Sequence, residues 1–207
     1  MPVNGKTVVI TGANGHLGQA VARRFAAAGA RLALLGRDAA ALQAVAAGLA
    51  ATVHVCDVTD EPAVAATLAQ VVTTQGAPYA LLNVVGGYAG GAKVHELDLA
   101  TWQQMLSLNL TSAFLCTKHV LPAMLAVGEG RIVNISSKVA LDLPPGAAAY
   151  AVAKAGVNAL TACLAKELRG TGVAVAALMP SVIDTPPNRA SMPKADPSKW
   201  VTPEQLA

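Results

Sequence analysis

The fold of this chain is decided by the stretch KTVVITGANGHLG, residues 6–18. Its first half is a short β-branched apolar run, which predicts a buried strand over residues 6–11. Gly12, Gly15 and Gly18 then let the backbone turn sharply, and a helix is predicted to continue to about Ala28. A helix N-terminus offers free N–H groups and partial positive charge to a phosphate. This order of strand, glycine turn and helix predicts a dinucleotide-binding unit.

The rest of the sequence alternates between short apolar runs and longer alanine-rich segments with good helix propensity. Six strands separated by helices predict a single-domain Rossmann-type α/β fold over residues 1–207, with a doubly wound parallel sheet in a three-layer αβα arrangement. The further predicted strands cover 31–35, 52–56, 79–85, 131–135 and 173–178. The further predicted helices cover 38–49, about 60–75, 99–126 and about 148–168.

Composition narrows the class of protein. Of the 207 residues, 54% are hydrophobic and 13% are charged, and the net charge of +3 comes without a Lys or Arg run that would indicate nucleic acid. No uninterrupted apolar run approaches the roughly 18 residues of a membrane span, and a strand near Lys6 leaves no room for a signal peptide. Cys56, Cys116 and Cys163 lack metal-ligand spacing, so we expect free thiols in a reducing cytoplasm and no metal site.

A second stretch, residues 132–154, carries the candidate catalytic groups. An apolar strand-like run ends in Ser136 and Ser137, and beyond a loop Tyr150 and Lys154 lie one turn apart on the same face of a predicted helix. The ammonium is predicted to lower the pKa of the Tyr150 phenol towards neutral pH, where it can exchange a proton with a substrate oxygen. Ser137 is placed to donate a hydrogen bond to that oxygen. A Tyr and a Lys at this spacing are common, so the assignment depends on the serines and the glycine turn.

The residues after the second strand bear on the choice of nicotinamide cofactor. An acidic side chain there binds the ribose hydroxyls of NAD, whereas a nearby Arg accommodates the 2′-phosphate of NADP. Because Gly36 occupies that position and Arg37 comes next, we expect NADP(H) to be favoured over NAD(H). The alternative is that Arg37 is a solvated loop residue and Asp38 only caps the next helix. Asp57, after the third strand, is a candidate for the adenine amino group.

Two loops follow strands at the edge where open α/β sheets bind ligands. The glycine turn of residues 86–91 follows the fourth strand, and residues 180–203, rich in Pro, Ser and Asp, follow the sixth. We expect the second loop to form a lid over the substrate, with a disordered tail as the alternative. Asn109 lies inside the long predicted helix, where periodicity alone favours a solvated or locally bonded surface Asn.

Together these motifs resemble the short-chain dehydrogenase/reductase family over residues 11 to about 200. The resemblance implies that Tyr150 is the general acid/base, Ser137 orients the carbonyl, and Lys154 binds the nicotinamide ribose and lowers the tyrosine pKa. It also implies that Asn109 holds a water in a proton relay. The motifs that carry it are Thr11-Gly12-x-x-Gly15-x-x-Gly18, Asp57, Asn83, Asn109, Ser137 and Tyr150-x-x-x-Lys154. The implied cofactor contacts are Gly12, Asn14, Gly15, Leu17, Gly18, Arg37, Asp57, Val58, Asn83, Tyr150, Lys154, Pro180, Ile183 and Thr185.

The chain departs from the common family pattern in three places. It has His16 where commoner members have Gly, Asn83-Val84-Val85-Gly86 in place of Asn-Asn-Ala-Gly, and Pro180-Ser181 in place of Pro-Gly. Residues 85–91, 138–142 and 184–193 look more like dihydropteridine reductases, which reduce quinonoid dihydropterin with NADH. Those enzymes carry no serine at the position of Ser137, and here no acidic residue follows the second strand. Both differences favour carbonyl or alcohol chemistry with NADP(H).

Family members usually continue with a further helix, a seventh strand and a tail, whereas this sequence stops at Ala207. We therefore expect residues 178–207 to comprise the substrate loop and the start of a truncated C-terminal region, with the sixth strand as an exposed edge. The hypothesis is an NAD(P)-dependent oxidoreductase acting on a small carbonyl or alcohol, as a homodimer or homotetramer. Two alternatives are a pterin reductase and a non-catalytic dinucleotide sensor, the second motivated by the truncated end and the altered glycine motifs.

Overall fold

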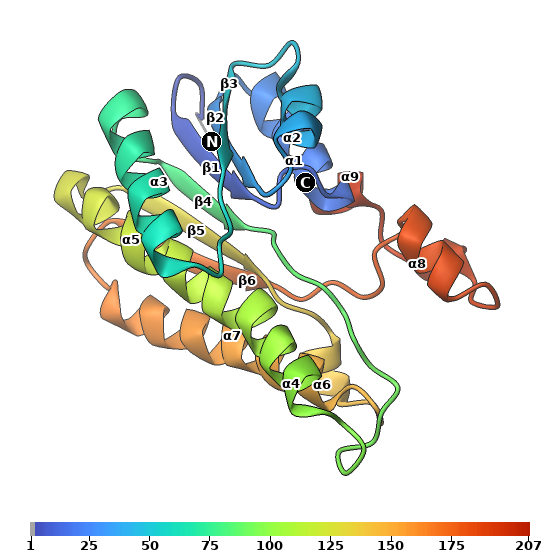
Figure 1. Cartoon of the computed structure of the whole chain (residues 1–207). Coiled ribbons are helices and arrows are strands. Elements are labelled where there is room, and N and C mark those ends of the chain that lie inside the picture. The colour runs from blue at the N-terminus through green and yellow to red at the C-terminus, as the bar shows by residue number, and fades with distance from the viewer. Residues whose placement is uncertain (1–2) are drawn as a thin grey trace.

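Six parallel strands form one sheet in the order β3-β2-β1-β4-β5-β6 in the computed structural model, which describes residues 3–207 (Figure 1). Every predicted strand is present, with ends shifted by one or two residues, and each neighbouring pair is parallel. The predicted doubly wound parallel sheet is therefore confirmed. The strands are β1 (Thr7–Thr11), β2 (Arg31–Gly36), β3 (Ala51–Val55), β4 (Ala80–Asn83), β5 (Gly130–Ile135) and β6 (Val173–Leu178).

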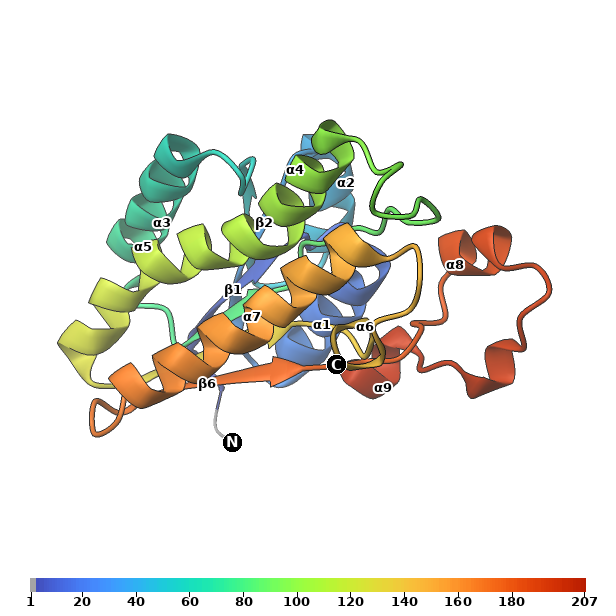
Figure 2. The same cartoon turned by 90° about the horizontal axis from the view of Figure 1, so that it is seen from below.

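Helices cover the two faces of this sheet, as Figures 1 and 2 show from two directions. One face carries α1 (His16–Ala27) and α2 (Ala39–Ala46). The opposite face carries α3 (Glu61–Gln75), α5 (Ser112–Val127) and α7 (Ala148–Glu167). The result is the three-layer arrangement predicted from the alternation of strands and helices.

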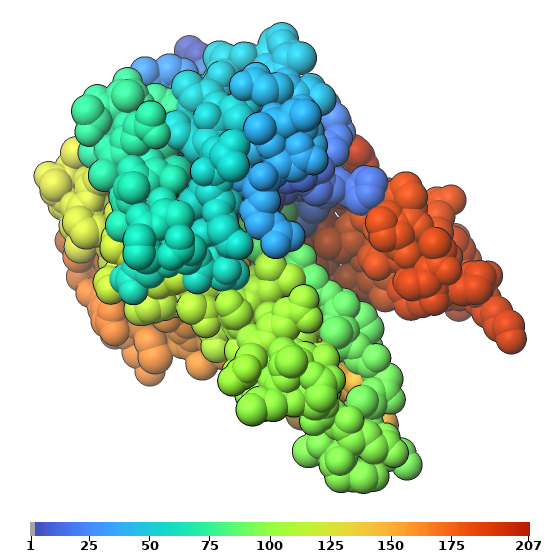
Figure 3. Space-filling model, viewed as in Figure 1, coloured from blue at the N-terminus to red at the C-terminus, as the bar shows by residue number. Residues whose placement is uncertain are grey.

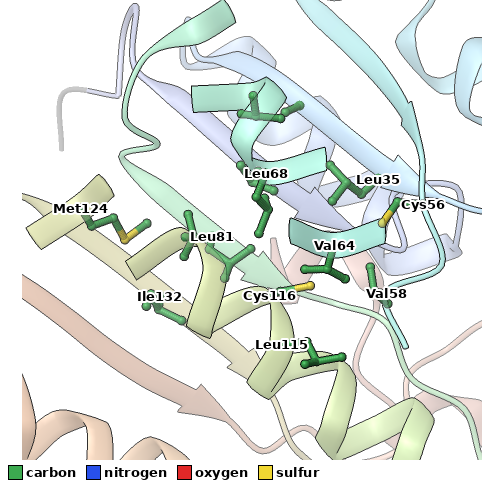
Figure 4. Close-up of a cluster of buried hydrophobic side chains, with 14 of the residues drawn as sticks. Leu35, Cys56, Val58, Val64, Leu68, Leu81, Leu115, Cys116, Met124 and Ile132 are labelled. Atoms are coloured by element: carbon green, nitrogen blue, oxygen red, sulfur yellow. The ribbon is translucent and has the colours of Figure 1, made fainter. Parts of the chain in front are cut away.

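Side chains of the central strands alternate between two hydrophobic clusters. In β1, Val9 packs towards α3 and α5, whereas Val8 and Ile10 pack towards α1 and α2. Figure 4 shows the first cluster, in which Leu81 and Ile132 of the sheet lie beside helical side chains such as Leu68, Leu115 and Met124. Because both faces of β1 are covered, the strand is buried along its whole length, which explains its uninterrupted apolar sequence.

The long helix predicted over residues 99–126 is interrupted. It consists of α4 (Leu99–Leu106), a π-helical turn η1 (Ser107–Thr111) and α5. The N–H of Ser112 donates to the carbonyl of Ser107, five residues earlier, which is the hydrogen bond of a π turn. Such turns shift the helix register, and this one turns Asn109 towards the protein interior.

Two helical stretches, Leu99–Val127 and Ala148–Glu167, have the length and apolar composition of membrane spans. Both also pack along one face of the sheet, where their apolar side chains contribute to a hydrophobic cluster. Packing on the sheet accounts for their composition, because a core helix of an α/β protein satisfies the same criteria.

The segment after β6 is folded, so the disordered-tail alternative is wrong. It contains α8 (Pro186–Ser191), a 3-10 turn η2 (Pro197–Lys199) and α9 (Pro203–Leu206), and α9 contacts α1. A parallel bridge between Ile183 and Val201 closes its base, with the N–H of Asp184 donating to the Val201 carbonyl at 2.8 Å. Between these points α8 projects from the body of the molecule (Figure 1).

Candidate active site

A cavity of about 640 Å³ opens at the carboxyl ends of the central strands. Figure 3 shows a hollow between the body of the molecule, the green lobe around residue 90 and the red C-terminal lobe. Segments far apart in sequence form its wall, including the glycine turn, the ends of β2, β3 and β4, the π turn and the start of α8. The lining residues are Gly12, Asn14–Gly18, Gly36–Asp38, Cys56–Thr59, Val84–Gly86, Gln104, Ser107, Leu108, Ile183, Thr185 and Asn188.

The glycine turn has the geometry that a pyrophosphate requires. Gly12 has a φ of +65°, and the N–H of Gly15 donates to its carbonyl at 3.0 Å. A Cβ on Gly18 would collide with the Gly12 carbonyl oxygen, so α1 can approach the turn only because residue 18 is glycine. No side chain caps the first turn of α1, which begins at His16 beside the cavity. These residues fit a dinucleotide, whose phosphates the N–H groups of this turn would bind.

The residues after β2 and β3 border the other end of the cavity. Arg37 is exposed and lines it, and within residues 3–207 its guanidinium donates no hydrogen bond. Asp38 caps α2 by accepting from the N–H of Ala41 at 3.0 Å, as the alternative interpretation predicted for this residue. Asp57 accepts from the N–H and the hydroxyl of Thr59 at 2.9 and 2.7 Å. These hydrogen bonds, with a smaller contribution from Arg37, lower the pKa of the Asp57 carboxyl.

Tyr150, Ser137 and Lys154 lie together, as the sequence predicted. Tyr150 stands in the first turn of α7, and its side chain shares a hydrogen bond with the side chain of Ser137, which follows β5. The Ser137 hydroxyl also accepts from the N–H of Val139 at 3.2 Å. The phenol is part-buried rather than packed in the core, so it can reach a substrate at this edge of the sheet.

The predicted electrostatics of the pair are wrong in direction. Lys154 is 3% exposed, and its Nζ donates to the Ile135 carbonyl at 2.7 Å. It lies 5.7 Å from the centroid of the Tyr150 ring, so the ammonium faces the ring and bonds a backbone carbonyl instead of the phenol. Burial raises the pKa of Tyr150, and the Ser137 hydrogen bond acts in the opposite direction. Burial also lowers the pKa of Lys154 to about 8.

Asn109 is 1% exposed, which contradicts the surface Asn expected from periodicity. Its Oδ1 accepts from the N–H of Gly87 at 3.1 Å, and its Nδ2 donates to the carbonyls of Gly87 and Met105, each at 3.0 Å. The side chain therefore fixes the start of the glycine loop after β4. Its role in holding a water stays a prediction.

Gly86 connects the cavity to the catalytic group. It lines the cavity, and a Cβ built on it would lie 2.9 Å from Asn109 Oδ1 and 3.3 Å from Lys154 Nζ. Neither Tyr150 nor Lys154 lines the cavity directly, but Lys154 Nζ lies just behind this residue and faces the Tyr150 ring, 5.7 Å from its centroid. The glycine turn and the candidate catalytic residues therefore belong to one site.

Two predicted cofactor contacts are not supported. The Asn83 side chain lies in the core, where its Nδ2 donates to Asn134 Oδ1 at 2.8 Å and to Thr117 Oγ1 at 3.3 Å. Asn83 and Asn134 are cross-strand neighbours whose side chains face α5 and α7, away from the cavity. Pro180 is buried, and its carbonyl accepts from the N–H of Lys138 at 2.9 Å. Ten of the other predicted contacts, Gly12, Asn14, Gly15, Leu17, Gly18, Arg37, Asp57, Val58, Ile183 and Thr185, line the cavity, whereas Tyr150 and Lys154 do not line it.

Some residues of the site were not singled out from sequence. Ser136 is buried and donates its hydroxyl to the Lys154 carbonyl at 3.0 Å, which ties the end of β5 to α7. Tyr88 contacts the Tyr150 ring from the glycine loop. The available signal for Ser136 was its position directly after β5, and that for Tyr88 was its position in the glycine turn that follows β4. No such signal exists for Gln104, Ser107, Leu108 or Asn188, which reach the cavity from helices.

Comparisons with known proteins agree with this geometry. The family model of the short chain dehydrogenases matches residues 6–196. A 2-dehydro-3-deoxy-L-rhamnonate dehydrogenase (NAD(+)) from Sphingomonas sp. (strain SKA58) is 37% identical over 183 residues, which cover 88% of this chain and 74% of that protein. The structure of an NAD+-bound xylitol dehydrogenase has a TM-score of 0.91 at 29% identity, covering 100% of this chain and 90% of that one. The structure of an actinorhodin polyketide ketoreductase with NADPH has a TM-score of 0.89 at 31% identity, covering 97% of this chain and 87% of that one.

Proposed function

Since this chain belongs to the short-chain dehydrogenase family and is an NAD(P)-dependent oxidoreductase, we propose that it interconverts a small-molecule carbonyl and the corresponding alcohol, with NADP(H) favoured over NAD(H). A nicotinamide bound at the glycine turn supplies or takes the hydride. The observation that carries the proposal is the group of Ser137, Tyr150 and Lys154 beside the cavity, in which Lys154 Nζ lies behind Gly86 and faces the Tyr150 ring.

The chain's own residues account for the proton in this reaction. The raised pKa of Tyr150 keeps the phenol protonated at neutral pH, so it is ready to donate a proton to a carbonyl oxygen that is being reduced. Ser137 holds a hydroxyl next to that phenol and would orient the same oxygen. Lys154, whose pKa is lowered to about 8 by burial, faces the ring of this phenol, with its Nζ 5.7 Å from the ring centroid. The arrangement suits carbonyl reduction at neutral pH.

Replacing Tyr150 by Phe tests the mechanism. The change removes the phenolic proton and keeps the ring, so we expect kcat/KM to fall by roughly two to four orders of magnitude in NADPH oxidation with a panel of carbonyl substrates. Tyr79→Phe, which makes the same chemical change at the residue immediately before β4, serves as the matched control and should keep most of the activity. Full activity of Tyr150→Phe would refute the mechanism.

The preference for NADP(H) is supported by Arg37, a cavity-lining cation with no hydrogen bond inside the described chain. Charge-assisted hydrogen bonds contribute about 1.5–3 kcal/mol. In fluorescence titrations, Arg37→Leu should therefore raise the Kd for NADPH about 10- to 100-fold and leave the Kd for NADH within about twofold. Arg23→Leu, an exposed site on α1, is the control. An equal rise in Kd for both cofactors would show that Arg37 does not bind the 2′-phosphate.

Two other functions are separated by direct assay. Turnover of quinonoid dihydropterin in preference to ketones would favour the pterin reductase, which the sequences of residues 85–91 and 184–193 resemble. Dinucleotide binding without turnover of any carbonyl or pterin would favour the sensor. The complete group of Ser137, Tyr150, Lys154 and Asn109 supports an enzyme, because binding alone needs no proton donor.

A cytoplasmic location and a homodimer or homotetramer also remain proposals. Three free thiols, of which Cys56 and Cys116 are buried, suit a reducing compartment. Exposed apolar side chains on α5 and α7, such as Phe114 and Val152, offer a surface to a second copy.

A further inference from the structure

We infer that Tyr88 is a specificity-determining residue of this active site, whose ring forms an aromatic wall beside Tyr150 and favours substrates with a flat ring next to the reacting carbonyl. The inference rests on the proposed carbonyl chemistry. It extends that proposal to the class of substrate.

Tyr88 lies directly against the proton-transferring residue. The ring centroids of Tyr88 and Tyr150 are 5.2 Å apart, and the ring planes are inclined by 79°, which is an edge-to-face pair. Unlike Tyr150, Tyr88 is 64% exposed. Most of its surface is therefore open to a molecule that brings an oxygen atom to the Tyr150 hydroxyl.

The loop that carries Tyr88 is held on both sides of it. Asn109 binds both the N–H and the carbonyl of Gly87, the preceding residue. The N–H of Gly91 donates to the carbonyl of Gly146 at 2.8 Å, which ties the loop to the segment leading into α7. An exposed aromatic side chain on an anchored loop loses little conformational freedom when a substrate binds. The free energy of its contact with the substrate is therefore not offset by a large entropic cost.

Gly90 explains how the ring keeps this position. A Cβ on Gly90 would collide with the hydroxyl oxygen of Tyr88 and would lie 3.0 Å from the Gly146 carbonyl. The Tyr88 phenol therefore folds back over Gly90, and only glycine leaves room for it. Because the atom that must move is the far end of a side chain, Gly90→Ala would displace the ring at little cost to the fold.

The aromatic side chain of Tyr88 favours a substrate with an aromatic ring over a substrate with a linear alkyl group. Offset-stacked and edge-to-face aromatic pairs contribute about 0.5–1.5 kcal/mol beyond the area that they bury. A ring beside the carbonyl can form such a pair with Tyr88, whereas a linear alkyl chain of equal carbon number cannot. This difference corresponds to roughly a 2- to 12-fold preference in kcat/KM.

The test compares ketones matched in carbon number, such as acetophenone and 2-octanone, with the intact chain and NADPH. Tyr88→Leu should lower the ratio of kcat/KM for the aryl ketone to that for the alkyl ketone by roughly 2- to 12-fold. The alkyl ketone itself should change by less than about twofold. Tyr88→Phe keeps the ring and should keep the ratio, while Tyr79→Phe controls for a tyrosine outside the site.

Gly90→Ala gives a second route to the same outcome, because it moves the Tyr88 ring without removing it and should also lower the ratio. An unchanged ratio in both Tyr88→Leu and Gly90→Ala, or a wild-type enzyme that turns over only alkyl ketones, would overturn the inference. A wild-type enzyme that turns over no ketone of the panel would overturn the proposed function itself.

Discussion

At the scale of single residues, burial determines the pKa values of Tyr150 and Lys154 more than the proximity of the two side chains does. Tyr150 and Lys154 are neighbours on α7, yet the ammonium donates to the Ile135 carbonyl and lies over the face of the phenol ring. Both groups lose hydration, and burial disfavours the charged form of each. The pKa of the phenol therefore rises and that of the ammonium falls.

The lowered pKa of Lys154 predicts a pH-dependent contribution to stability. Between about pH 8 and its ordinary pKa of 10.5, the folded protein binds fewer protons at this group than the unfolded chain does. The free energy of unfolding should therefore rise with pH in this window, by up to about 1.4 kcal/mol per pH unit. Urea denaturation of wild type and Lys154→Met at pH 7.5 and 9.5 measures the effect. Parallel pH dependences of the two proteins would contradict it.

At the scale of secondary-structure elements, two local irregularities position the site. The glycine turn lets α1 approach the end of β1, and the π turn η1 brings Asn109 under the loop after β4. Each irregularity has a local cost, such as a positive φ at Gly12 or a shifted helix register. Both occur where backbone groups lie close to the cavity or to the candidate catalytic side chains.

Gly18→Ala tests the contact between α1 and the glycine turn. The added Cβ would collide with the backbone oxygen of Gly12, so the turn must open and its N–H groups lose their alignment. We expect the Kd for NADPH, measured by fluorescence titration, to rise at least about tenfold. Ala26→Gly, which weakens α1 by up to about 1 kcal/mol without touching the turn, should leave the Kd unchanged. Unaltered binding by Gly18→Ala would show that the turn tolerates the displacement.

At the scale of the whole molecule, the cavity joins segments from both halves of the chain. The glycine turn, the ends of three other strand–loop units and the C-terminal segment all border it. The bridge between Ile183 and Val201 and the contact of α9 with α1 hold the C-terminal segment in place. A ligand in the cavity would therefore connect elements from both halves of the chain.

Cofactor binding should accordingly stabilise the whole fold. At a concentration of 100 times its Kd, NADPH should add about 2.7 kcal/mol to the free energy of unfolding. For a chain of this size, that corresponds to a rise in Tm of roughly 5–11 °C in a thermal denaturation experiment. Tyr150→Phe should keep this shift, because the change removes chemistry and leaves the binding turn intact. A protein whose Tm does not respond to either cofactor would not be a dinucleotide enzyme.

The sequence by itself determined the parts of this protein that depend on local patterns. Apolar runs separated by alanine-rich segments predicted the six strands and the helices between them, because periodicity reflects which faces are buried. The spacing of Gly12, Gly15 and Gly18 predicted the binding turn, and the spacing of Tyr150 and Lys154 placed both on one face of α7. These features depend only on residues that are close together in the sequence.

Only the tertiary structure decided the properties that depend on distant neighbours. Asn83 faces the core and Asn109 faces the site, the reverse of what local pattern suggested for Asn109, because strand pairing and a π turn set their directions. Likewise, Tyr88 meets Tyr150 only because the loop after β4 lies against the entry to α7. The pKa values follow from burial, and burial depends on how all the elements pack together.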